Sequence, residues 1–162
     1  MLPESRVASS LIRSLSTGDA KWLAELHALC FDEAQCWSAD LFRSMLSQMP
    51  VTGLVLITAY EPVAFLIARR VLDEGEILTL AVHPSQRRRG HARALIDAYL
   101  GEQKHKGAVR LFLEVAVNNQ PAIELYKKMD FSIVSTRKEY YEQPKDKGDA
   151  KLDGYVMAKN IV

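Results

Sequence analysis

The residues best suited to acid–base chemistry are a glutamate and a tyrosine in the second half of the chain. Glu114 interrupts the apolar run Leu111-Phe-Leu-Glu-Val-Ala-Val117, and Tyr126 lies in the amphipathic stretch that follows. A strand and the next helix can place two such groups beside one cleft, where glutamate would take a proton and tyrosine would give one. Each residue also has a structural interpretation, Glu114 as a solvent-facing strand residue and Tyr126 as a core aromatic.

A second candidate site is a basic loop between an apolar strand and a helix. After the strand comes Pro84, and then the run Arg87-Arg-Arg-Gly-His-Ala-Arg93. A helix N-terminus favours anions, small residues let the backbone approach a ligand, and arginines add attraction for phosphate. The run predicts a diphosphate site, with a solvated basic loop as the alternative. Its spacing fits neither the P-loop nor the dinucleotide-binding fingerprint.

Length, composition and charge indicate an ordinary globular protein. With 162 residues, 48% hydrophobic residues and a net charge of +1, we expect one domain spanning 1–162 and no overall attraction for nucleic acid or membranes. The chain has no apolar run of about 18 residues and no apolar signal core, so we expect a cytoplasmic location. His27, Cys30 and Cys36 lack a fourth ligand and a recognised spacing, so we predict no metal site.

Hydrophobic periodicity and turn residues predict an order of strands and helices. The expected strands cover residues 10–15, 53–59, 63–71, 77–82, 109–117, 131–140 and 152–159. The expected helices cover residues 17–31, 38–48, 88–104 and 118–129, with Thr17, Ser38 and Asn118 or Asn119 as N-caps. Antiparallel strands followed by a β-α-β-α unit predict a mixed α/β sheet with helices on both faces.

The element order and two motifs resemble the GCN5-related N-acetyltransferase (GNAT) superfamily. Arg87-x-x-Gly90-x-Ala92 is similar to its Arg/Gln-x-x-Gly-x-Gly/Ala signature. The stretch 113–131 resembles the Leu-Glu-Val…Asn…Ala-Ile-x-Leu-Tyr…Gly-Phe run of the RimI-type branch, which acetylates the N-terminal alanine of a small-subunit ribosomal protein. The resemblance implies the GNAT fold, a mixed and mostly antiparallel central sheet of about seven strands with helices on both faces.

The same resemblance implies a role for each matching residue. Glu114 would be the general base, Tyr126 the general acid, and acetyl-CoA the cosubstrate without a metal. The residues implied to border the peptide cleft are Trp37, Tyr140 and Tyr141. Those implied to bind coenzyme A are Leu80, Ala81, Val82, Arg87, Arg88, Arg89, Gly90, His91, Ala92, Arg93 and Asn119.

Several positions depart from the family pattern and bear on the acceptor. Ala116 stands where arginine is common, Cys36 where proline is common, and Asp130 where glycine is common. His91 replaces a small or apolar residue in the phosphate loop. We predict acetyl transfer to a protein N-terminal amine, the N-terminus of a ribosomal protein. The alternatives are a small-molecule amine or lysine acceptor, and a non-catalytic acyl-CoA-binding regulatory module.

Overall fold

The predicted order of elements is confirmed by a computed structural model, which describes residues 10–143, 145–148 and 150–161. The strands are β1 (Ser10–Ser14), β2 (Val51–Thr58), β3 (Glu61–Val71), β4 (Glu74–Val82), β5 (Arg110–Ala116), β6 (Ser132–Tyr141) and β7 (Leu152–Asn160). The α-helices are α1 (Ala20–Cys30), α2 (Ala39–Leu46), α3 (His91–His105) and α4 (Gln120–Lys128). Short 3₁₀ turns are η1 (Thr17–Asp19), η2 (Glu33–Gln35), η3 (Pro84–Gln86) and η4 (Lys145–Lys147).

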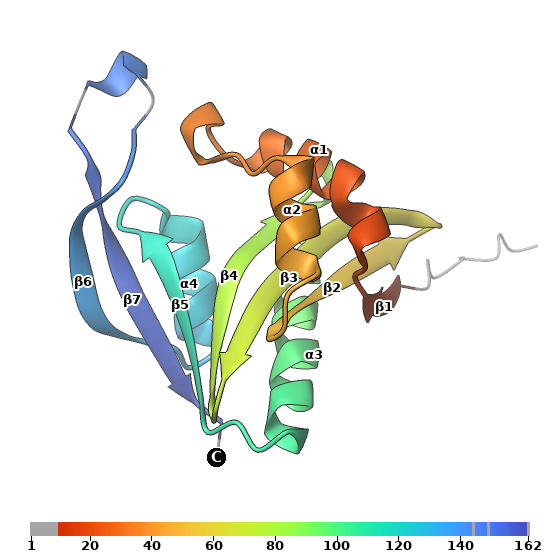
Figure 1. The fold of residues 1–162 in the computed structure, drawn as a ribbon. Coiled ribbons are helices and arrows are strands. Elements are labelled where there is room, and N and C mark those ends of the chain that lie inside the picture. The colour runs from red at the N-terminus through yellow and green to blue at the C-terminus, as the bar shows by residue number, and fades with distance from the viewer. Residues whose placement is uncertain (1–9, 144, 149, 162) are drawn as a thin grey trace, which may run out of the picture.

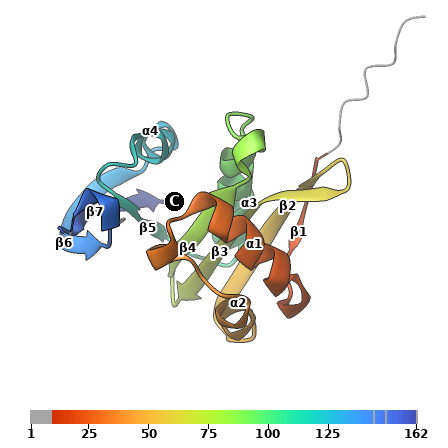
Figure 2. The same ribbon diagram turned by 90° about the horizontal axis from the view of Figure 1, so that it is seen from above.

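All the strands join in one 7-stranded sheet with the order β1-β2-β3-β4-β5-β7-β6. The β4–β5 pair is parallel and the other pairs are antiparallel, so the predicted mixed, mostly antiparallel sheet is confirmed. Helices α1 and α2 lie on one face and α3 and α4 on the other (Figures 1 and 2). The sheet thus lies between two pairs of helices, and its two sides are called the α1–α2 face and the α3–α4 face.

Each face of the sheet carries its own hydrophobic core. The core on the α3–α4 face includes Leu66, Leu95, Ile96, Tyr99, Leu111 and Met157. The core on the α1–α2 face includes Leu23, Leu26, Phe42, Phe65 and Ile67. Alternation along β3 sends neighbouring side chains to opposite cores, which explains why this strand is apolar at consecutive positions.

The pairing of β4 with β5 stops partway along the two strands. The parallel register joins Glu74–Ile77 to Arg110–Leu113 and ends there. The register of β4 against β3 shifts at the same level, and Leu78 is left without a partner in β3. Such a bulge bends and twists the bulged strand. Beyond it β4 and β5 diverge, which opens a gap at one end of the sheet (Figure 1).

Two predicted helix starts were wrong by several residues. Thr17 was predicted to cap the first helix, but it lies in η1, and the carboxylate of Asp19 organises the start of α1 instead. That carboxylate accepts hydrogen bonds from the backbone N–H of Ser16 at 2.8 Å and from Trp22 Nε1 at 3.1 Å. The third helix begins at His91 rather than residue 88, because Arg88 and Gly90 have positive φ. Ser38 caps α2 as predicted, since its side chain accepts from the Leu41 N–H.

A buried histidine lies at the centre of the α1–α2 core. His27 is 2% exposed, and its ring stacks on Phe31 at 4.1 Å and on Trp37 at 5.5 Å between centroids. Its Nδ1 accepts a hydrogen bond from the Trp37 backbone N–H at 3.3 Å. Burial lowers the pKa of His27 to about 4. The neutral ring therefore joins α1 to the segment before α2.

This burial makes folding stability depend on pH. An unfolded histidine titrates near 6.5, so below that pH the unfolded chain binds a proton that the folded chain excludes. The contribution of the neutral His27 ring to the free energy of unfolding is fully present above about pH 6.5. We expect it to fall by roughly 3 kcal/mol as pH drops to about 4. We expect His27→Gln to flatten this slope in urea unfolding across pH 4–7. The exposed His105→Gln is the control, and equal slopes in both variants would contradict the assignment.

Candidate active site

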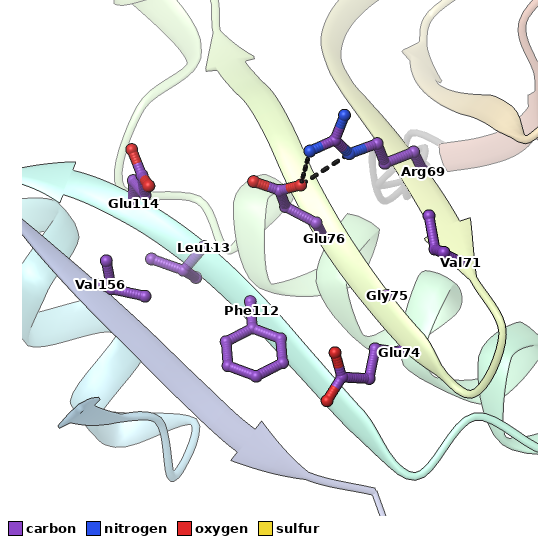
Figure 3. Close-up of a pocket in the computed structure, with 9 residues that line it drawn as sticks. All are labelled: Arg69, Val71, Glu74, Gly75, Glu76, Phe112, Leu113, Glu114 and Val156. Atoms are coloured by element: carbon purple, nitrogen blue, oxygen red, sulfur yellow. Dashed lines mark hydrogen bonds and ion pairs between the residues drawn. The ribbon is translucent and has the colours of Figure 1, made fainter. Parts of the chain in front are cut away.

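Glu114 lies on the α1–α2 face of the sheet, at the first position of β5 beyond its pairing with β4. Its neighbours Leu113 and Val115 point into the opposite core. The Glu114 side chain is 21% exposed and lines a cavity of about 370 Å³. Figure 3 shows this cavity, whose lining residues are Arg69, Val71, Glu74, Gly75, Glu76, Phe112, Leu113, Glu114 and Val156.

Glu114 has a cationic partner that the sequence analysis missed. Arg137 on β6 donates from Nη1 to Glu114 Oε1 at 2.6 Å. This hydrogen bond raises the pKa of the Arg137 guanidinium further above its ordinary value. The two residues are far apart in the sequence and belong to strands separated by β7, so no local pattern connects them.

Tyr126 is buried on the other side of the sheet. It lies on α4 at 8% exposure within the α3–α4 core, and its ring centroid is 5.9 Å from that of Phe131. Burial raises the pKa of Tyr126 to about 12. The phenol is therefore neutral at physiological pH and holds its proton more tightly than an exposed tyrosine does. The structural interpretation as a core aromatic and the role of proton donor are compatible in this position.

A tyrosine pair lies at the end of β6, and one of its members, Tyr141, lies near both candidate catalytic groups. Tyr140 and Tyr141 are perpendicular, with ring centroids 5.0 Å apart. Burial raises the pKa of Tyr141, and the nearby Glu114, Tyr140 and Tyr126 raise it further. Tyr141 therefore lies close enough to both Glu114 and Tyr126 to interact with each electrostatically.

Trp37 lies in the segment between α1 and α2, on the same face as Glu114. Its ring contacts Phe42 at 5.4 Å between centroids, in addition to His27. Gln35 in this segment donates from Nε2 to the carbonyl oxygen of Glu142, just after β6, at 3.0 Å. The α1–α2 segment and the end of β6 are thus joined on one side of the sheet.

The basic loop has the backbone shape expected of an anion site. Arg88 and Gly90 have φ of 60° and 81°, in the left-handed region, and α3 begins directly after Gly90. Such turns point successive backbone N–H groups into one concavity. Among the residues that the structure describes, the Nε2 atom of His91 is buried without a hydrogen-bond partner. Burial, and to a lesser extent the charge of Arg89, lowers the pKa of His91. The loop is therefore suited to a diphosphate.

The strand leading to this loop is suited to the rest of coenzyme A. Residues Leu80, Ala81 and Val82 lie beyond the bulge, where β4 has no partner on its β5 side among the described strands. A pantetheine arm carries amides that can pair with such a strand edge. Arg87 Nε donates to the Val82 carbonyl oxygen at 3.4 Å, which ties the loop to the strand. Asn119 caps α4, where its side chain accepts from the Ala122 N–H at 3.4 Å.

The described residues include no group of three or more histidine, cysteine, aspartate or glutamate side chains arranged to hold a metal ion. The free Cys30 donates from Sγ to the Val82 carbonyl oxygen at 3.3 Å. Within the same part of the chain, no helix is long and apolar enough to cross a membrane.

The loop geometry predicts a strict requirement for glycine at residue 90. A Cβ there meets no atom within 4 Å, but positive φ costs other residues roughly 1–2 kcal/mol. We expect Gly90→Ala to weaken acetyl-CoA binding by about tenfold in calorimetry, because the loop loses its preformed shape. Gly107→Ala is the matched control, since Gly107 also has open space and positive φ (78°) but follows α3. Equal affinity in the two variants would argue against the loop as the binding site.

Comparison with known proteins identifies the family. The model of the acetyltransferase (GNAT) family matches residues 20–131. The chain is 37% identical over 152 residues to the [ribosomal protein bS18]-alanine N-acetyltransferase of Escherichia coli K12, covering 93% of this chain and 97% of that protein. Both findings confirm the family resemblance seen in the sequence.

Solved structures agree with this assignment. The crystal structure of the ribosomal-protein-S18-alanine N-acetyltransferase from Escherichia coli has a TM-score of 0.85 and 30% identity, covering 94% of each chain. Arabidopsis thaliana NAA60 in complex with acetyl-CoA has a TM-score of 0.79 at 20% identity, covering 94% of this chain and 99% of that one, and so shares the fold. The chain belongs to the acetyltransferase (GNAT) family and is an acetyl-CoA-dependent N-acetyltransferase.

Proposed function

We propose that this enzyme acetylates the N-terminal alanine of ribosomal protein bS18. The observation that carries the proposal is the similarity to the Escherichia coli enzyme of that name, which extends over 97% of its length. The geometry is compatible with an amine acceptor, because Glu114, a group able to take a proton, lines a cavity. On this proposal the chain works as one domain in the cytoplasm, where ribosomal proteins are made.

The roles proposed for Glu114 and Tyr126 are those that the family resemblance implies. Glu114 takes a proton from the acceptor amine as its nitrogen bonds to the acetyl carbon. The carbon–sulfur bond breaks, and Tyr126 gives its phenolic proton to the departing thiolate. An N-terminal amine has a pKa of about 7.7–8.0, against about 10.4 for lysine, so a single glutamate is a more adequate base for an N-terminus.

The remaining site residues have proposed binding roles. The pyrophosphate of acetyl-CoA would lie on the backbone amides of residues 88–93, with Arg87 beside them, and the pantetheine arm along residues 80–82. Asn119 is proposed to contact coenzyme A from the start of α4. Trp37, Tyr140 and Tyr141 are proposed to border the acceptor, since they lie in the two segments that Gln35 joins on the Glu114 side.

The test is a panel of acceptors incubated with acetyl-CoA and analysed by mass spectrometry. The panel contains a bS18 N-terminal peptide, the same peptide with a blocked N-terminus and an added lysine, and a polyamine. We expect acetyl on the N-terminal alanine of the first peptide. Acetylation of the lysine or the polyamine alone would overturn the proposal.

The base role predicts a pH-dependent defect. Glu114→Gln should lower the rate at neutral pH by about 10²–10⁴-fold. The loss should shrink as pH rises past 7.7–8.0, because more of the N-terminal amine is then already neutral. Glu74→Gln removes another carboxylate from the same cavity and serves as the control in the pH–rate series. Wild-type rates for Glu114→Gln at every pH would remove Glu114 from the mechanism.

The packing of Tyr141 predicts a second effect on the acceptor. A Cβ on Gly154 would lie 2.8 Å from Tyr141 Cε2, so the ring must move. We expect Gly154→Ala to raise the KM for the peptide severalfold and to leave acetyl-CoA affinity unchanged. Gly101→Ala in α3, where nothing lies within 4 Å, is the control. An unchanged peptide KM would show that Tyr141 does not border the acceptor.

A further inference from the structure

Arg137 contacts the proposed base but has no part in the chemistry described so far. Its Nη1 lies 2.6 Å from Glu114 Oε1, and its guanidinium lies over the ring of Tyr140, 4.1 Å from the centroid. The Arg137 side chain is 50% exposed, whereas that of Glu114 is 21% exposed. Ion pairs with such an exposed partner contribute little to folding stability. A contribution to folding stability therefore does little to explain the ion pair between Arg137 and Glu114.

An irregularity in β6 supports the position of Arg137. Arg137 pairs with Gly154 and Tyr141 pairs with Leu152, so three residues of β6 lie opposite Asp153 alone. Within this bulge Glu139 has a φ of 52°, and its N–H donates to Asp153 Oδ1 at 2.9 Å. Bulges re-aim side chains. This one brings Tyr140 against the guanidinium that reaches Glu114.

The contact makes the two oxygens of the Glu114 carboxylate inequivalent. Arg137 binds Oε1, which leaves Oε2 for the acceptor amine. The other charged groups lining this cavity do not compete for Oε1: Arg69 binds Glu76 at 2.6 Å, and Glu74 is an anion.

We propose that Arg137 is a positioning residue for the reaction. Stacked on Tyr140, it holds Glu114 turned so that Oε2 faces the acceptor amine. This inference rests on the proposed role of Glu114 as the base. Arg137 does not touch the reacting atoms and acts only through Glu114.

The experiment measures steady-state kinetics on the bS18 N-terminal peptide for Arg137→Gln, Arg137→Lys and Lys138→Gln. We expect Arg137→Gln to lower kcat about 10–100-fold, because a misplaced base slows proton transfer. The KM for the peptide and the KM for acetyl-CoA should change little. Arg137→Lys should recover part of kcat, since it keeps the charge. Lys138→Gln removes an exposed charge from the next position of the same strand and should match the wild type.

A double-mutant cycle separates this inference from the proposed function. If Arg137 acts through Glu114, Arg137→Gln should have almost no further effect in the Glu114→Gln background. A full additional loss in that background would overturn the inference, as would a raised peptide KM with unchanged kcat. Failure of the proposed function appears separately, as wild-type enzyme that does not acetylate the N-terminal alanine.

Discussion

The site depends on the incomplete pairing of β4 with β5. A continuous parallel ladder would use the backbone groups of Leu80–Val82 within the sheet, whereas the register stops at Ile77 and Leu113. Backbone N–H and C=O groups left without a strand partner need another one. The amides of a pantetheine arm have the right chemistry to supply it. Under the proposed function this gap is where coenzyme A binds, and Glu114 is the first residue of β5 beyond the paired stretch.

The same gap explains how two reactants can meet in a sheet with helices on both faces. The basic loop and α3 lie at the end of β4, while the carboxylate of Glu114 faces the α1–α2 side. Tyr126 is packed on the α3–α4 side, and Tyr141 is near both groups. Under the proposed function, acetyl-CoA approaching along β4 and an acceptor approaching from the Glu114 side would meet between Glu114 and Tyr126. Although the net charge of the chain is only +1, its charges are unevenly placed, with arginines in the basic loop and glutamates lining the cavity.

Backbone irregularities lie at both halves of the site. Arg88 and Gly90 give the basic loop left-handed backbone conformations, and Glu139 does the same for the bulge of β6. Strained backbone of this kind persists only where surrounding contacts hold it. The contacts here are the start of α3 for the loop and the Asp153 carboxylate for the bulge. The regular strands supply the scaffold on which these two irregular segments are fixed.

The sequence by itself determined the features that depend on neighbours along the chain. Strand alternation, helix periodicity and the caps Ser38 and Asn119 act within a few residues, and so they predicted the order of elements. The start of α1 was predicted wrongly, because it depends on Asp19, which is held partly by a residue of another element. Arg13 Nη2 of β1 lies 2.9 Å from Asp19 Oδ1.

Only the tertiary structure decided the partner of Glu114 and the end of the β4–β5 ladder. Arg137 reaches Glu114 because β7 lies between β5 and β6, and because a bulge shifts the register of β6. Register between strands distant in sequence depends on how whole faces of the sheet pack, since a shift of one residue sends every side chain to the other face. No stretch of sequence contains that information, which is why the contact between Arg137 and Glu114 was not predicted.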